Sequence, residues 1–328
     1  MTTQPLRWGL LSTAKINQAL IAPLRVSKRN ILTAVCSRSQ EAADAYAKEN
    51  KIEKAYGSYE ALLADPDIDV IYNPLPNHLH AEWTIKACEA GKHVLLEKPS
   101  ALTVAEVDAI EEAATKHKRV VAEAFMYRHH PQTLRAVEIV QNGKLGVVKY
   151  VRGLFNAQIN RDGNYRFDPA QGGGALWDLG CYPISFTRAM LGMEPIEVFG
   201  WQSTGKTGID ESFSAQLRFP GNVFAQLSCS FVLPFYTSME VVGSEGRLTV
   251  PMPFKPGEEE HIMVTRENNV TDTIKIDGDE LYIGEVEDMA DAILDGKPQR
   301  VSLAFSRGNV AVITALFESA RTGKPVMI

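Results

Sequence analysis

Short apolar runs and amphipathic stretches alternate through the first part of the chain. The apolar runs predict strands at residues 6–11, 31–36, 69–72, 93–96 and 120–123. The stretches between them have helical periodicity and predict helices at residues 12–26, 41–50, 80–90 and 104–116. Strands and helices that alternate at this spacing predict an α/β fold with a doubly wound parallel sheet. Right-handed crossovers place the carboxyl ends of such strands along one crevice, where ligands bind.

The pattern changes after residue 124. A helix is expected at 132–141, and alternating apolar and polar residues predict strands at residues 147–156, 198–203, 212–219, 223–231 and 237–242. Strands this closely spaced predict an α+β domain with an open, mainly antiparallel sheet and a helix at 177–191 on one face. The sequence does not tell which face stays free. We therefore predict two domains, residues 1–124 and 125–328, with amphipathic helices at 285–294 and 303–321, the last folding back toward the first domain.

Composition narrows the class of protein. The 328 residues carry a formal net charge of −6 and a pI of about 5.7, without a basic stripe, which argues against nucleic acid or an anionic membrane as a partner. No apolar run approaches the ~20 residues of a membrane span, and the first residues lack the apolar core of a signal peptide. The cysteines are scattered without paired spacing, which is typical of reduced thiols. We expect a cytoplasmic protein.

A lysine stands at the end of a predicted buried strand. Lys98 follows the run 93–96 within Glu97-Lys98-Pro99, and Pro99 ends the strand because it cannot continue the ladder. Lys98 therefore lies at the carboxyl edge of the parallel sheet, where ligands bind. Burying an unpaired ammonium is costly, so a functional role is favoured over a side chain that only extends to solvent, although that alternative stays open.

A second motif lies in the other half of the chain. The glycines of Gly172-Gly173-Gly174 lead into a helix on which Asp178 and Tyr182 are four residues apart, a spacing that puts both side chains on one face. A carboxylate, a phenol and a lysine form a plausible proton-handling set. An unperturbed phenol has a pKa of about 10, and a nearby lysine cation would lower that pKa toward the range of a useful base.

Together, Glu97-Lys98-Pro99 and the glycine-rich Asp-x-x-x-Tyr motif resemble the Gfo/Idh/MocA oxidoreductases, named for glucose–fructose oxidoreductase and inositol dehydrogenase. The resemblance covers essentially the whole chain. It implies a Rossmann domain followed by a substrate domain whose second sheet face pairs with another subunit, in a homodimer or homotetramer. It also implies hydride transfer between nicotinamide and a sugar or cyclic polyol, with Tyr182 as general acid/base, Lys98 lowering its pKa, and Asp178 orienting a substrate hydroxyl or Lys98.

The residue at position 182 refines what the resemblance implies. Many relatives have histidine there, and Cys181-Tyr182-Pro183 is similar to the branch with tyrosine, which includes sugar and dihydrodiol dehydrogenases. This branch points to oxidation of an aldose at its anomeric carbon, with reduction of a ketose or 1,5-anhydro sugar as the nearest variant. Arg166 is expected to bind substrate, because its segment resembles a family stretch found near the substrate. A surface ion pair is the alternative for Arg166.

The cofactor residues are less regular than the usual fingerprint. The predicted phosphate loop contains Ser12, Thr13, Ala14, Lys15 and Ile16, with Ser12 and Ala14 where G-x-G would put glycines. Small residues still let the backbone approach a pyrophosphate at the positive end of a helix. After the second strand, Ser37-Arg38-Ser39 replaces the expected acid, and a guanidinium suits a 2′-phosphate, so NADP is preferred over NAD. The alternative is that Ser37 caps the next helix and Arg38 is solvated.

The turn after the third predicted strand resembles the family's Pro-x-x-x-His turn, which implies further contacts to the cofactor. We expect the cofactor to be bound also by Pro74, Leu75, Asn77, His80, Glu97, Lys98 and Arg128. Only six residues precede Arg7, so a dissociable cofactor is expected. No metal is expected, because neither His78-x-His80 nor His129-His130 has spacing typical of zinc. Two other functions stay open: a regulatory protein that binds NADP without turnover, and glycoside cleavage through transient oxidation by NAD.

Overall fold

The structure is a computed structural model that describes residues 4–328. It divides into two compact units. The first runs to Met126 and also includes Tyr282–Arg307, and the second comprises Tyr127–Leu281 and Gly308–Ile328. No helix among the described residues is both long and apolar enough to cross a membrane.

The first unit contains a six-stranded sheet of order β3-β2-β1-β4-β5-β6, in which every neighbouring pair is parallel. Its strands are β1 (Leu6–Leu11), β2 (Asn30–Cys36), β3 (Lys54–Tyr56), β4 (Val70–Asn73), β5 (His93–Leu96) and β6 (Val121–Glu123). Its helices are α1 (Asn17–Val26), α2 (Gln40–Glu49), α3 (Tyr59–Ala64), α4 (His80–Glu89), α5 (Val104–His117) and α8 (Ile283–Leu294). This order confirms the predicted doubly wound sheet. The strand order reverses between β1 and β4, which places the ligand crevice of such folds where Leu11 and Asn73 end their strands.

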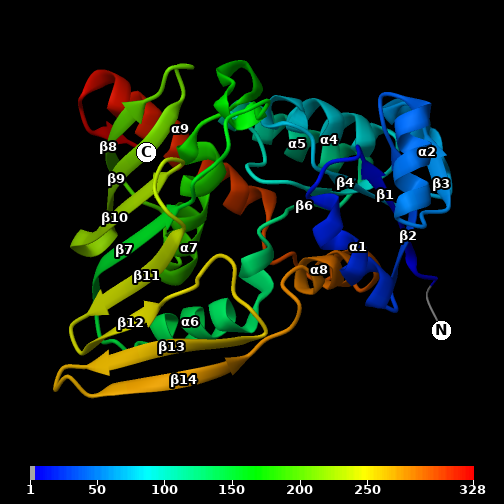
Figure 1. Cartoon of the computed structure of the whole chain (residues 1–328). Helices are drawn as coiled ribbons and strands as arrows, with labels where there is room; N and C mark the ends of the chain where they lie inside the picture. The colour runs from blue at the N-terminus through cyan, green and yellow to red at the C-terminus, as the bar shows by residue number, and fades with distance from the viewer. Residues whose placement is uncertain (1–3) are drawn as a thin grey trace. The chain divides into compact units, whose positions relative to one another are not determined.

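Helix α8 belongs to the first unit although it comes late in the chain (Figure 1). Its stripe of Val286, Met289 and Ala290 is buried in the core beneath β1 and β2. Arg29 Nη1 donates to Asp291 on this helix at 2.5 Å. The predicted boundary assigned residues 125–328 to one domain, and α8 departs from that assignment because its apolar stripe packs with this core. Of α9 (Leu303–Thr322), which was expected to fold back, only the part up to Arg307 groups with the first unit.

The second unit contains a nine-stranded sheet of order β14-β13-β12-β11-β7-β10-β9-β8-β15. Only β7 and β10 pair in parallel, and the other neighbours are antiparallel, as predicted. The strands are β7 (Val148–Asn156), β8 (Glu197–Thr204), β9 (Asp210–Phe219), β10 (Val223–Ser230), β11 (Tyr236–Gly243), β12 (Gly246–Val250), β13 (Glu259–Arg266), β14 (Thr271–Asp277) and β15 (Val326–Met327). Its α-helices are α6 (Pro131–Gln141), α7 (Cys181–Leu191) and most of α9.

Short helical turns join these elements. A π-helical turn at Leu176–Gly180 leads directly into α7. The 3₁₀ turns lie at Asn77–Leu79, Met126–His129, Tyr165–Phe167, Pro169–Gln171 and Pro220–Asn222. The π turn replaces the first part of the single helix predicted at 177–191.

The two faces of the large sheet differ in burial. On β9, Phe213, Ala215 and Leu217 are buried, whereas Ser214 and Gln216 between them are exposed. Aromatic contacts of Phe213 with Phe317 on α9, at 5.7 Å between ring centroids, show which layer covers the apolar face. The sequence did not tell which face of this sheet stays free. In the structure it is the face that carries Ser214 and Gln216.

Candidate active site

Each unit carries one part of the predicted residue set. In the first unit, Glu97 directly follows β5 and Lys98 comes next. The neighbouring strand β4 contacts this strand end, because Tyr72 Oη donates to Glu97 Oε1 at 2.5 Å. The backbone N–H of Lys98 donates to Glu97 Oε2 at 3.2 Å. Burial, together with the Glu97 charge, raises the pKa of Tyr72 well above its usual range, so the phenol stays a donor. Tyr72 thus fixes the carboxylate beside Lys98, a role that its place in an apolar strand did not reveal.

His80 supports the loops on both sides of this strand end. It is 1% exposed, and its ring nitrogens Nδ1 and Nε2 each lie 2.7 Å from a carbonyl oxygen, of Pro99 and of Leu75 respectively. Burial lowers the pKa of His80 to about 4, and the two carbonyls oppose that shift. Because protein carbonyls occupy both nitrogens, His80 is placed to hold the predicted cofactor loop, in which Pro74, Leu75 and Asn77 are also buried.

The backbone of the predicted phosphate loop is strained at Ser12, and a glycine there would relieve the strain. Ser12 has φ 118°, a region that L-residues seldom adopt, and it stands where the fingerprint places a glycine. Asn17 Nδ2 donates to the Ser12 carbonyl at 2.8 Å and braces this turn. Among residues 4–328, the buried Ser12 Oγ has no hydrogen-bond partner. The first turn of α1 contains no acidic residue, and Lys15 before it is exposed. These features fit the pyrophosphate of a dinucleotide.

The end of β2 distinguishes the two roles considered for Ser37-Arg38-Ser39. The side chain that caps α2 is Ser39, whose Oγ accepts from the Ala42 N–H at 3.4 Å, so the capping alternative for Ser37 is wrong. Arg38 is exposed and forms no salt bridge within the described part of the chain. A half-buried hydroxyl and an exposed guanidinium are thus both available at the strand end.

In the second unit, Asp178 lies on the π turn and Tyr182 on the first turn of α7. Asp178 is 7% exposed and Tyr182 5% exposed. Arg166 Nε donates to Asp178 Oδ2 at 2.8 Å, and its guanidinium also lies over the Tyr165 ring. The structure thus brings together Arg166 and Asp178, two residues predicted to handle substrate, as a partly buried ion pair. Arg128 is half-buried on the 3₁₀ turn Met126–His129 of this chain.

Aromatic rings surround Tyr182. The centroids of Tyr127, Phe155 and Phe254 lie 5.7, 5.3 and 5.5 Å from its ring. Tyr127 Oη donates to Ser185 Oγ at 2.9 Å, which fixes one of these rings against α7. The three rings come from separate segments of the second unit, so no local sequence signal could have grouped them. They pack around the Tyr182 ring from several sides.

Comparison with known proteins decides the family. Residues 6–125 match the model of the oxidoreductase family with an NAD-binding Rossmann fold, and residues 133–249 match the GFO/IDH/MocA C-terminal domain. The chain belongs to the GFO/IDH/MocA oxidoreductase family. Among curated relatives, D-xylose 1-dehydrogenase (NADP(+)) 2 of Haloferax volcanii is 36% identical over 97% of this chain and 98% of its own length. The family assignment confirms an oxidoreductase with a Rossmann dinucleotide-binding fold.

Solved structures extend the comparison to the whole chain. The 3-ketoreductase KijD10 of Actinomadura kijaniata, solved with NADP and TDP-benzene, has a TM-score of 0.90 and 27% identity over 96% of this chain and 98% of its own. The aldose-aldose oxidoreductase of Caulobacter crescentus has a TM-score of 0.92 over 99% of this chain and 100% of its own, and at 24% identity it shows the fold alone. Structures of KijD10 include substitutions of one tyrosine and of one lysine, which are as many positions apart as Lys98 and Tyr182.

Proposed function

We propose that this protein is an NADP-dependent dehydrogenase that oxidises an aldose of the xylose or glucose type at its anomeric carbon. The observation that carries the proposal is the Arg166–Asp178 ion pair beside Tyr182, within a wall of aromatic rings. Charged hydrogen-bonding groups next to aromatic faces suit a substrate that is rich in hydroxyl groups and has apolar C–H faces. The Haloferax relative, which is named for xylose and NADP, supports this substrate class.

The proposed mechanism divides the work between cofactor and side chains. NADP held by the loop at Ser12 and by Arg38 would supply the acceptor for the hydride of the substrate carbon. Tyr182 takes the proton of the reacting hydroxyl, and the Lys98 cation favours the phenolate and donates to the same oxygen. Asp178 accepts from a neighbouring substrate hydroxyl, and Arg166 holds that carboxylate in place by the 2.8 Å contact from Nε. The ring contacts around Tyr182 limit its motion between turnovers.

The preference for NADP over NAD is assigned to Arg38. Its exposed guanidinium at the end of β2 suits the 2′-phosphate, and Ser12, Ser37 and the start of α1 are assigned to the remaining phosphate and ribose contacts. A charge-assisted hydrogen bond contributes about 1.5–3 kcal/mol, so Arg38→Ala should weaken NADP binding roughly ten- to a hundredfold. Binding of NAD should change little. Arg25→Ala, at an exposed arginine at the end of α1, is the matched control; an equal loss in both variants, or none in Arg38→Ala, would contradict the assignment.

The substrate class is tested by reduced-nicotinamide absorbance. NADP or NAD is mixed with a panel of pentoses, hexoses, anhydro sugars and dihydrodiols, and NADPH is mixed with ketoses and 1,5-anhydro-ketoses. Reduction of NADP by an aldose is the expected result. Activity only in the reductive direction would replace the proposal by a ketose or anhydro-sugar reductase. Tight NADP binding without turnover of any compound would instead indicate a regulatory protein.

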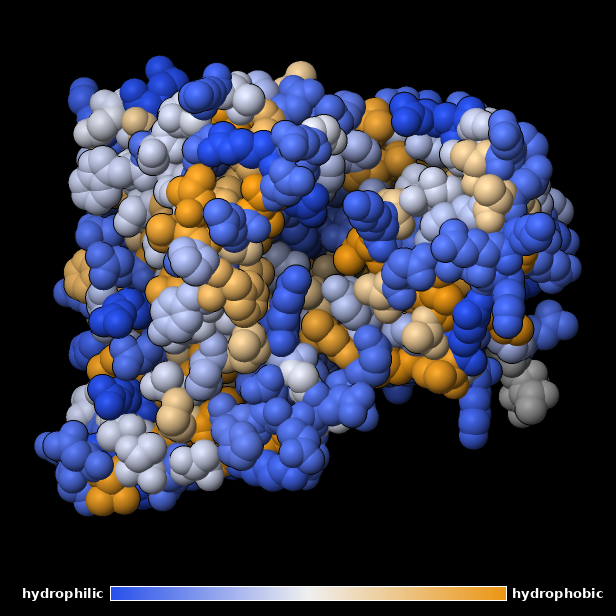
Figure 2. Space-filling model, in the orientation of Figure 1, coloured by the Kyte–Doolittle hydropathy of each residue, from blue (hydrophilic) through white to orange (hydrophobic). Residues whose placement is uncertain are grey.

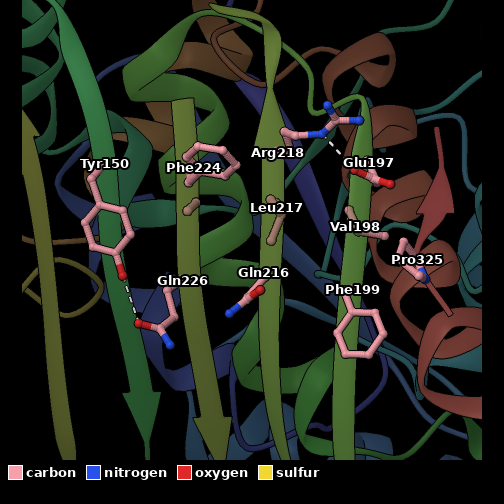
Figure 3. Close-up of a pocket in the computed structure, with 11 residues that line it drawn as sticks. Tyr150, Glu197, Val198, Phe199, Gln216, Leu217, Arg218, Phe224, Gln226 and Pro325 are labelled. Carbon is pink, nitrogen blue, oxygen red and sulfur yellow. Dashed lines mark hydrogen bonds and ion pairs between the residues drawn. The ribbon is translucent and has the colours of Figure 1, made fainter. Parts of the chain in front are cut away.

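A second copy of the chain is proposed to cover the free face of the large sheet. Figure 3 shows side chains projecting from β7–β10 there, with Tyr150 Oη donating to Gln226 Oε1 at 2.8 Å and Arg218 Nε paired with Glu197 at 2.7 Å. They line a depression of about 490 Å³. Hydrophobic patches lie among hydrophilic residues on the surface of this unit (Figure 2). Large apolar residues project from β8 and β10 on this face, notably Trp201 and Phe224, which are 57% and 47% exposed.

Such a mixed apolar and polar face is typical of an interface between subunits. A homodimer or homotetramer through this face is therefore expected. Phe224→Glu would place a charge at the centre of the contact and should lower the molar mass in solution to that of the 36.2 kDa chain, measured by light scattering. Val270→Glu, at an exposed apolar residue beyond β13, is the control. A monomeric wild type would refute the proposal.

A further inference from the structure

Asp210 is a buried carboxylate that the proposed reaction does not use. It is the first residue of β9 and is 3% exposed. Its Oδ2 accepts from the backbone N–H of Leu176 at 2.7 Å, and the N–H of Ala175 also bonds to it. Leu176 begins the π turn that contains Asp178 and leads into Tyr182. The carboxylate therefore binds the start of the segment on which the proposed reactive groups lie.

The backbone around Gly174 is shaped to admit this carboxylate. Gly174 has φ 129°, and a Cβ at this position would lie 2.1 Å from Asp210 Oδ1. Only glycine therefore lets the chain pass so close to Asp210. The N–H of Asp178 in turn donates to the Gly174 carbonyl at 3.1 Å, so the same glycine is linked to the carboxylate on one side and to the π turn on the other.

Asp210 is bound by backbone N–H groups and not by a basic side chain. Among residues 4–328 it forms no salt bridge, and burial raises its pKa to about 7 against the opposing effect of the N–H donors. The titratable group that faces it from β10 is Cys229, whose pKa is raised by burial and then by the Asp210 charge, with Cys181 and Asp178 adding to the effect. A buried charge held by the start of a helix is stabilised by the aligned N–H groups.

The segment that Asp210 binds is a π-helical turn, Leu176–Gly180. A π-helical turn is rare and is found frequently at functional sites. Asn309 Nδ2 donates to the Cys181 carbonyl at 3.2 Å, which holds the other end of this turn. Side chains from distant parts of the second unit thus bind both ends of the turn. Asp210 binds its first residue, Leu176, and Asn309 binds Cys181, which directly follows it.

We propose that Asp210 is a positioning residue: by binding the start of the π turn it sets the directions of Asp178 and Tyr182. The proposal rests on the proposed function in that Tyr182 and Asp178 act on substrate. Asp210→Asn keeps a single acceptor oxygen and places an NH2 group where the second carboxylate oxygen stood, so the Leu176 and Ala175 N–H groups are bound less well, the turn relaxes toward a regular helix and both side chains shift. A shift of this kind lowers kcat more than it changes cofactor binding, because productive alignment is what is lost.

The test compares Asp210→Asn with Asp272→Asn, a matched change at an exposed carboxylate on β14. Asp210→Asn should lower kcat at least tenfold, leave the KM for NADP within twofold, and remove from the pH profile of kcat an ionisation near pH 7. Asp272→Asn should match the wild type in all of these. A kcat within twofold of the wild type in Asp210→Asn, with the same pH profile, would overturn the proposal.

Fluorescence gives a readout that needs no substrate. Trp177 lies on the π turn, 7% exposed, with Phe317 at 5.8 Å. Its emission, identified by difference from Trp177→Phe, should change in the wild-type protein with a midpoint near pH 7, and this change should be absent in Asp210→Asn. If the wild type turns over no compound of the panel, the proposed function fails, while the difference in Trp177 emission between the wild type and Asp210→Asn still decides on Asp210. If Asp210→Asn does not fold, Asp210→Glu takes its place, and a Trp177 emission and a kcat that both match the wild type overturn the proposal.

Discussion

Replacing Ser12 by glycine should make the protein more stable and at the same time a weaker binder of NADP. Ser12 has φ 118°, and a non-glycine residue held in such a region costs of order 1–3 kcal/mol. Glycine removes this strain, at an entropic cost of roughly 0.5–1 kcal/mol. The net expectation is a gain of about 0.5–2 kcal/mol in the free energy of unfolding of the first unit. For a unit of about 150 residues, that is a rise in Tm of a few degrees.

The hydroxyl makes the opposite contribution in the complex with NADP. Ser12 Oγ is buried and lacks a hydrogen-bond partner among the described residues. A phosphate oxygen would supply that partner, and a hydrogen bond to a charged group contributes about 1.5–3 kcal/mol. Ser12→Gly and Ser12→Ala should therefore both raise the Kd of NADP roughly ten- to a hundredfold.

Thermal unfolding without cofactor and calorimetric titration with NADP measure the two effects. Ser12→Ala is the matched control, because it removes the hydroxyl but keeps a Cβ at the strained position. Ser12→Gly should melt above Ser12→Ala by a few degrees, and the two should bind NADP equally weakly. Equal melting temperatures would refute the strain at Ser12, and an unchanged Kd would refute its contact with the phosphate.

Other consequences of the structure can be measured in the same way. The folded pKa of Asp210 lies near 7, above the ordinary value of 3.8, so its contribution to the unfolding free energy falls as pH rises from about 4 to about 7, by up to about 4 kcal/mol. In urea unfolding at several pH values, the stability of Asp210→Asn relative to wild type should rise over this range, and a constant difference would contradict the shift. Arg166→Lys keeps the charge but loses the 2.8 Å Nε contact to Asp178, and should raise the KM for sugar about tenfold while leaving the KM for NADP unchanged; equal changes in both constants would argue against a substrate role. Tyr72→Phe removes the 2.5 Å donor to Glu97 and should cost about 1–3 kcal/mol of stability; an unaltered urea midpoint would contradict that role of the phenol.

Apolar runs predicted five of the six strands of the first sheet, because those five are short and largely buried. The predicted runs at 6–11 and 93–96 coincide with β1 and β5. β3 and α3 escaped because β3 has three half-exposed residues and α3 only six residues, too few for a periodic pattern. Helix α8 was recognised as amphipathic at 285–294, but a stripe of apolar residues does not say which core it enters.

The sequence indicated the candidate reactive residues, but not the residues that pack around them. Lys98, Asp178 and Tyr182 stand in local motifs, which a sequence displays directly. Asp210 and the ring of Phe254 reach the π turn and Tyr182 from distant positions, and a lone aspartate before a strand carries no signal of that contact. Long-range contacts of this kind depend on packing between elements, and single-sequence patterns do not encode it locally.

The central claim is that Lys98 and Tyr182 act in one chemical step, and a double-mutant cycle tests it most directly. The rate constant for reduction of bound NADP by an aldose is measured in single turnovers for wild type, Lys98→Met, Tyr182→Phe and the double variant. Residues that act as a unit are strongly non-additive. Joint action predicts that each single change lowers the rate at least a hundredfold and that the double variant is no slower than the worse single one. Losses that multiply in the double variant would mean independent roles and would contradict the claim.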